Sequence, residues 1–129
     1  MRFSTKMLPK QPDEFAPDGS EVRKRQRLSG GSMAHFTLPP TSCSTAVKHL
    51  SVDEIWFVLS GVGEMWRKDE EGNEEITSLQ SGVSLTIPLG TSFQFRVTGD
   101  KPLTVVAITM PPWPTDRDEA VPVQGKWGK

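Results

Sequence analysis

The chain has 129 residues and carries 15 Lys and Arg against 16 Asp and Glu, for a formal net charge of −1. This length favours a single domain with its own core, and the near-balance of charge argues against a protein dedicated to nucleic acid. Cys43 is the one cysteine, which excludes an intramolecular disulfide and favours a reducing, cytoplasmic location. The first residues lack the apolar run of a signal peptide and no segment is long enough to span a bilayer, so we expect no membrane partner.

The chain begins with a polar, proline-bearing segment, residues 1–18, which we expect to form an N-terminal arm. Short runs rich in Val, Ile, Phe, Trp and Thr follow, separated by Gly and Pro, and this spacing predicts short strands joined by tight turns. The predicted strands are 21–29, 32–38, 44–49, 54–60, 62–68, 74–79, 83–87, 92–98 and 103–110. A hairpin turn is expected at Gly72 and Asn73, where positive φ costs little. The sequence therefore predicts an all-β barrel or sandwich over residues 19–110.

The segment after Met110, residues 111–129, has too many prolines for a helix or a central strand. We expect an extended C-terminal tail that packs on the barrel or on the seam of a dimer, with Trp113 as an anchor.

The predicted strand 54–60 is apolar on both faces, apart from Glu54 and Ser60. A strand with one wet face alternates polar and apolar residues more cleanly. We therefore expect a cover on the outer face as well as a core on the inner one. A second copy of the chain is the favoured cover, since symmetric pairs are the commonest assemblies, and the tail around Trp113 is the alternative.

Two short motifs stand in order along the chain. In the first, His49 is followed by Glu54 after four residues and by Gly61 after six more. The second consists of Gly82, Pro88 and Gly90. Over residues 32–110 the chain resembles the cupins, and in particular the small RmlC-like, mannose-6-phosphate-isomerase-like members that end in a similar MPPWP tail. The resemblance implies a jelly-roll barrel, also described as a double-stranded β-helix.

The metal ligands of the family are where the sequence departs from it. Cupins that hold a metal commonly use three His and the Glu, but Val47 and Phe93 stand at two of the His positions. One imidazole and one carboxylate leave most of a coordination sphere to water, so we expect no cofactor. The alternative is a weakly held divalent metal on His49, Glu54 and His35, the second His of the chain. Glu64 and Cys43 are weaker replacements.

The resemblance also implies that His49 and Glu54 point into the barrel. There, burial raises the pKa of a carboxyl, so the two side chains are a tentative acid–base pair for moving a proton next to a carbonyl. The alternative is a hydrogen-bonded pair that only satisfies two inward polar groups. The predicted ligand pocket consists of Val47, His49, Glu54, Trp56, Phe93, Phe95 and His35. For each aromatic residue, ordinary core filling is the competing explanation.

Three functions follow as hypotheses. The first is a homodimeric cupin that binds a small polar or anionic metabolite; whether it is an enzyme stays open, and a metal-independent isomerase or epimerase is the favoured reaction. The second is a metal-dependent dioxygenase or isomerase with a reduced ligand set. The third is a non-catalytic structural or regulatory barrel. Because cupins share one scaffold across unrelated chemistries, the resemblance does not choose among them.

Overall fold

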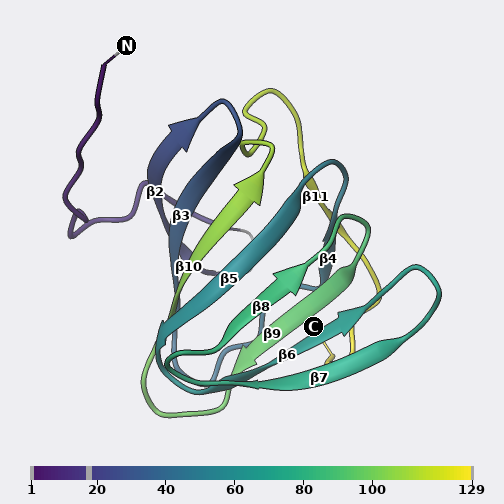
Figure 1. Ribbon diagram of the computed structural model, residues 1–129. Coiled ribbons are helices and arrows are strands. Elements are labelled where there is room, and N and C mark those ends of the chain that lie inside the picture. Colours follow the sequence, from purple (N-terminus) through teal and green to yellow (C-terminus); the bar gives the residue numbers. More distant parts are fainter. Residues whose placement is uncertain (1, 17–18, 129) are drawn as a thin grey trace.

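The computed structural model describes residues 2–16 and 19–128, and these residues form strands, turns and extended segments without a helix. Residues 1, 17–18 and 129, at the limits of the predicted arm and tail, lie outside the described part. Two antiparallel sheets face each other (Figure 1). The six-stranded sheet runs in the order β1 (Glu14–Phe15), β2 (Glu21–Leu28), β3 (Gly31–Leu38), β10 (Leu103–Met110), β5 (Asp53–Ser60) and β8 (Ser84–Ile87). The five-stranded sheet runs in the order β11 (Ala120–Pro122), β4 (Val47–His49), β9 (Ser92–Val97), β6 (Gly63–Lys68) and β7 (Glu74–Leu79).

This arrangement confirms the predicted all-β jelly-roll barrel. Each of the nine predicted strands is present, most of them within one residue of the predicted limits, whereas β4 begins three residues later than expected. The short strands β1 and β11 were not predicted. Both lie at the edge of a sheet, where two or three residues pair without the alternating pattern that identifies a longer strand.

The glycine of the first motif illustrates why the motifs predict the fold. Gly61 has φ +94°, a conformation that side chains rarely adopt, and a Cβ there would meet the carbonyl oxygen of Pro102. Gly82 and Gly90 of the second motif also have positive φ, at 95° and 85°. The motif glycines therefore mark tight turns that join the strands.

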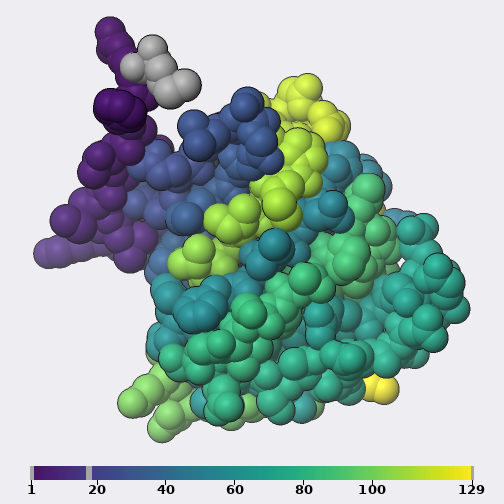
Figure 2. Space-filling view, in the orientation of Figure 1, coloured from purple at the N-terminus to yellow at the C-terminus, as the bar shows by residue number. Residues whose placement is uncertain are grey.

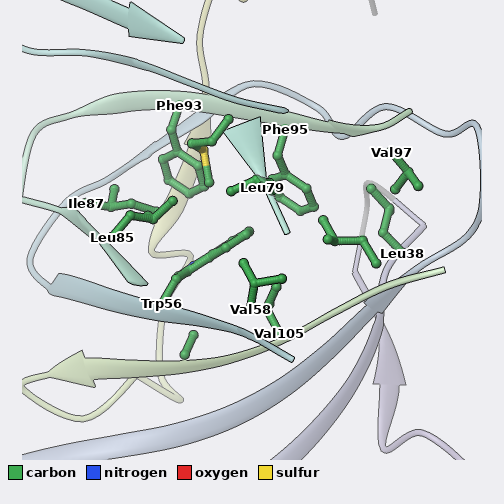
Figure 3. Packing of buried hydrophobic residues seen from close by; sticks show 13 residues of the cluster. Leu38, Trp56, Val58, Leu79, Leu85, Ile87, Phe93, Phe95, Val97 and Val105 are labelled. Carbon is green, nitrogen blue, oxygen red and sulfur yellow. The ribbon is translucent and has the colours of Figure 1, made fainter. Parts of the chain in front are cut away.

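The core lies between the two sheets, where inward side chains from strands of both sheets meet. Trp56 of β5 extends between the sheets and packs edge-on against Phe95 of β9, with ring centroids 4.9 Å apart (Figure 3). The buried cluster consists of Leu38, Trp56, Val58, Met65, Leu79, Leu85, Ile87, Phe93, Phe95, Val97, Leu103, Val105 and Ala107. Side chains thus fill the middle of the barrel.

The N-terminal segment lies along β2 and is held there by hydrogen bonds to residues of β2. Asp13 donates its backbone N–H to the carbonyl of Val22. Arg23 donates to the carbonyls of Pro9 and Lys10, at 2.9 and 2.6 Å. The segment therefore covers Arg23, which is buried although it faces away from the core.

The C-terminal tail crosses one end of the barrel and then covers the five-stranded sheet from outside. After Trp113, strand β11 pairs with β4, with Ala120 opposite His49. Further on, the fully buried amide of Gln94 accepts the backbone N–H groups of Lys126 and Trp127 and donates to the carbonyl of Trp127. The alternative that the tail covers the outer face of strand 54–60 is wrong, because Ile55, Phe57 and Leu59 remain exposed. None of the described residues belongs to a helix that could cross a membrane.

Candidate functional site

His49 and Glu54 meet at one end of the barrel, as the first motif implied. His49 is the last residue of β4 and Glu54 is the second residue of β5, so the two side chains come from the two facing sheets. Nε2 of His49 lies 3.5 Å from Oε1 of Glu54, and each side chain is 5% exposed. The two groups are close enough to exchange a proton directly after a small adjustment.

Aromatic rings enclose the imidazole on two sides. The ring of Phe93 packs edge-on against it at 5.2 Å between centroids, and the ring of Trp113 does so at the same distance. Trp113 belongs to the tail, and its backbone N–H donates to Oγ of Ser32. Trp113, which we expected to anchor the tail, therefore lies over His49 at one end of the barrel.

Burial sets the protonation of both groups. Removal from water lowers the pKa of His49 to about 4, against a smaller opposing effect of the Glu119 carboxylate. Removal from water likewise raises the pKa of Glu54 to about 8, and the indole of Trp56 opposes the rise. At neutral pH the imidazole is therefore neutral and Glu54 carries a proton. Glu54 is then a proton donor and His49 a proton acceptor.

Two ring nitrogen atoms of the site lack the hydrogen-bond partners that buried groups normally have. Among the described residues, Nδ1 of His49 and the indole Nε1 of Trp56 have no hydrogen-bond partner. The carboxyl of Glu54 lies 3.5 Å from Nε2 of His49 and also interacts with the indole of Trp56.

Glu119 is a second buried carboxylate near the site that the sequence did not identify. Its side chain accepts hydrogen bonds from the backbone N–H of Ser51 (2.6 Å), from Oγ of Ser51 (2.7 Å) and from the backbone N–H of Val52 (2.9 Å). Burial alone raises the pKa of Glu119, but these hydrogen bonds outweigh burial and leave the pKa below its usual value. Glu119 therefore stays ionised and ties the tail to the loop between β4 and β5.

The other predicted pocket residues divide into two groups. Trp56, Phe93 and Phe95 are buried in the barrel and Val47 packs against the same cluster. His35 does not join them. On β3 the neighbouring Phe36 packs on the core, so His35 faces outward, opposite Val106 on β10 and Arg23 on β2. The inclusion of His35 in the pocket is corrected by this alternation of side chains along the strand.

The donor set does not fit the metal of other cupins. Val47 and Phe93 lie opposite each other on β4 and β9 and offer no ligand atom. His35 lies on the other side of the sheet, and Trp113 packs on the imidazole of His49. Within residues 2–16 and 19–128, no group of three or more His, Cys, Asp or Glu could hold a metal ion. One neutral imidazole and one protonated carboxyl are a poor site for a first-row metal.

Two surface hollows of the molecule lie away from this pair. One, of about 580 Å³, is lined by residues that include Cys43, Arg96 and Trp127. The other, of about 290 Å³, is lined by residues that include Arg67 and Asn73. Neither is lined by His49 or Glu54.

Comparisons with known proteins agree with this architecture. The family model described as cupin domain matches residues 34–109, which is more than half of the chain. No curated protein has a sequence that matches. Among solved structures, protein BH2720 of Bacillus halodurans has a TM-score of 0.66 at 18% identity, over 81% of this chain and 78% of that one.

Two further solved structures have the same fold, at similarly low sequence identity. TT1209 of Thermus thermophilus has a TM-score of 0.64 at 16% identity, over 81% of this chain and 94% of that one. A deletion mutant of oxalate decarboxylase from Bacillus subtilis has a TM-score of 0.72 at 18% identity, over 88% of this chain and 30% of that one. At such identities the likeness shows the fold alone.

Proposed function

The chain belongs to the cupin family, and from that premise we propose that it binds a small polar or anionic metabolite between His49, Glu54 and Trp56, without a metal ion. The observation that carries the proposal is the set of unpartnered polar groups in a buried site. An unsatisfied buried group costs about 1–3 kcal/mol, and a ligand with a carbonyl or carboxyl group would satisfy these. The proposed form is a homodimer, and the single Cys43 favours the cytoplasm.

The protonation states support a reaction class as well. A protonated Glu54 can donate to a carbonyl oxygen while a neutral His49 accepts a proton from the neighbouring carbon, which is the pairing that isomerisation requires. The ligand enters when the tail around Trp113 moves aside, and closure of Trp113 over the bound ligand then excludes water. Oxalate decarboxylase of Bacillus subtilis has Mn(II) centres, whereas the groups at this site are suited to proton transfer without a metal.

A non-catalytic barrel is the second candidate, and the filled interior favours it. Thermal denaturation in the presence of millimolar oxo acids, hydroxy acids or hexose phosphates distinguishes ligand binding from a non-catalytic barrel. We expect at least one of these classes to raise the melting temperature, because a ligand that binds only the folded state stabilises it by mass action. Glu54→Gln should abolish the shift, and Ile76→Ala, on the outside of β7, should retain it.

Absence of a shift with all three classes, together with a Glu54→Gln variant that is more stable than the wild type, would overturn ligand binding in favour of the non-catalytic barrel.

A further inference from the structure

Glu119 of the tail binds every backbone N–H of the connection between β4 and β5, which consists of residues 50–52. The N–H of Leu50 donates to the backbone carbonyl of Glu119 at 3.1 Å. The N–H groups of Ser51 and Val52 donate to one carboxylate oxygen, at 2.6 and 2.9 Å, and Oγ of Ser51 donates to the other at 2.7 Å. A single residue therefore fixes the backbone of the whole connection.

The surroundings of this carboxylate favour a negative charge. Glu119 is 2% exposed, and a buried charge is stable only where hydrogen-bond donors surround it. Two successive backbone N–H groups and one hydroxyl supply these donors, an arrangement that binds anions. From the exposed part of the tail, the guanidinium of Arg117 donates to Oγ of Ser51 at 3.0 Å. The carboxylate is therefore held in a fixed direction.

The connection that Glu119 holds joins the two residues of the proposed site. His49 directly precedes the connection, and Glu54 is the second residue after it. Ala120 lies opposite His49, so Glu119 stands next to the end of β4. The carboxylate and the imidazole also interact electrostatically, and this interaction raises the pKa of His49 against the larger effect of burial.

The tail that Glu119 anchors also carries Trp113, whose ring packs on the imidazole of His49. Residues 115–118, between Trp113 and Glu119, are exposed. Figure 2 shows the start of the tail, in yellow-green, at the surface beyond the end of β10. Glu119 is thus the buried anchor at the end of an exposed segment, and it fixes two elements that border the imidazole.

We infer that Glu119 is a positioning residue, which holds the imidazole of His49 in place against Glu54. It acts through the connection 50–52 and through the tail that carries Trp113. Its charge has a second effect in the proposed reaction. When a proton moves from a carbon atom of the ligand to His49, the ionised carboxylate stabilises the imidazolium that forms. This second effect rests on the proposed function, whereas the position of the imidazole can be measured in the free protein.

NMR of the wild type and of Glu119→Gln, labelled with carbon-13 in the histidine rings, tests the position. The variant removes the charge and replaces an acceptor oxygen by a donor. We expect the nuclear Overhauser effects from the imidazole of His49 to the rings of Phe93 and Trp113 to be lost. Amide exchange in the connection 50–52 should become about tenfold faster or more, because charge-assisted hydrogen bonds are broken. His35, the other histidine, faces the far side of the sheet and serves as the reference in the same spectrum.

Two further variants separate position from stability. Ser51→Ala removes the hydroxyl but keeps the backbone N–H groups, so the contacts of the imidazole should persist. Glu119→Asp keeps the charge on a shorter side chain and should weaken the same contacts less. It becomes the test if Glu119→Gln does not fold, as judged by circular dichroism. A folded Glu119 variant that loses stability but keeps every contact of the imidazole would overturn the inference.

Thermal denaturation with a millimolar oxo acid, hydroxy acid or hexose phosphate distinguishes this inference from the proposed function. A ligand that raises the melting temperature of the wild type should raise that of Glu119→Gln less, because the imidazole of His49 is displaced. If none of the three classes stabilises the wild type but the imidazole is displaced in the variant, the positioning role of Glu119 stands and only the proposed function fails.

Discussion

The two faces of strand β5 each depart from the usual pattern of burial, in different ways. On the inner face, Glu54, Trp56 and Val58 are 5%, 2% and 0% exposed, so a carboxyl and an indole N–H lie in the core. On the outer face, Ile55, Phe57 and Leu59 are 43%, 47% and 41% exposed. A strand of a solvated sheet normally buries its apolar side chains and exposes its polar ones.

Each face of β5 therefore lacks a different kind of partner. Within the described chain, the inner face contains an indole nitrogen without a hydrogen-bond partner, and the outer face contains exposed apolar side chains. A small polar molecule can form a hydrogen bond with the polar group of the inner face, and a protein surface can cover the apolar side chains of the outer face. Because side chains alternate along β5, the proposed binding site and the surface that we expect a second copy to cover lie on opposite faces of the same sheet.

The largest expected effect contrasts the two large aromatic residues of β5. Trp56→Ala removes a buried indole from the core and should lower the free energy of unfolding by about 3–5 kcal/mol. Phe57→Ala removes a half-exposed ring and should cost about 1 kcal/mol or less in the monomer. Urea denaturation at low protein concentration measures both. Equal losses would show that the outer face is packed within the monomer and would remove the contrast.

The next effect is the pH dependence that the inner face imposes. Glu54 has a folded-state pKa of about 8 against an ordinary 4.5, so folding favours its protonated form. Its contribution to stability is therefore complete below pH about 4.5 and is lost as the pH rises towards about 8. Glu54→Gln has no charge to lose, so its free energy of unfolding should fall less between pH 6 and 8 than that of the wild type. Glu71→Gln, on the exposed hairpin, is the control and should follow the wild type.

Burial of His49 has the opposite effect on the pH dependence of stability, because it makes the folded protein less stable as the pH falls. Its folded-state pKa of about 4 lies below the ordinary 6.5, so stability is complete above pH 6.5 and falls as the pH decreases towards 4. A wild-type stability curve that is flat from pH 4 to 8 would contradict the burial of both groups.

The smallest expected effect is on metal content. With two donors at the inner face, purified protein should contain far less than one metal ion per chain, and His49→Ala should leave the content unchanged. Elemental mass spectrometry on tag-free protein measures this. Near-stoichiometric metal that disappears in His49→Ala would show that the polar groups of the inner face are ligands.

Much of the architecture could be predicted from the sequence because glycine and alternation are local signals. Gly61, Gly82 and Gly90 stand at positive φ where the motifs require turns. The His49–Glu54 contact also followed from a motif whose spacing reflects the fold. The structure confirms that Glu54 points inward, and burial there raises the pKa of its carboxyl.

The rest of the site depends on contacts that no local pattern encodes. His35 and Phe36 are adjacent, and alternation says that they face opposite ways but not which of them faces inward. Trp113 and Glu119 reach the site through an irregular tail, in which neither periodicity nor a motif fixes the path. Their roles became visible only when the tail was seen to cross the end of the barrel.

The central place of β10 has a consequence for the order of events in folding. β3 ends at Leu38 and β10 begins at Leu103, yet the two strands pair along their whole length. Pairing across so long a loop is slow, since the entropy of closing the loop is lost before the contacts form. Until β10 inserts between β3 and β5, Met33 and Ile55 lie on strands that do not pair with each other. The outer face of the six-stranded sheet is therefore complete only after β10 has inserted, so the surface that this face offers forms late in folding.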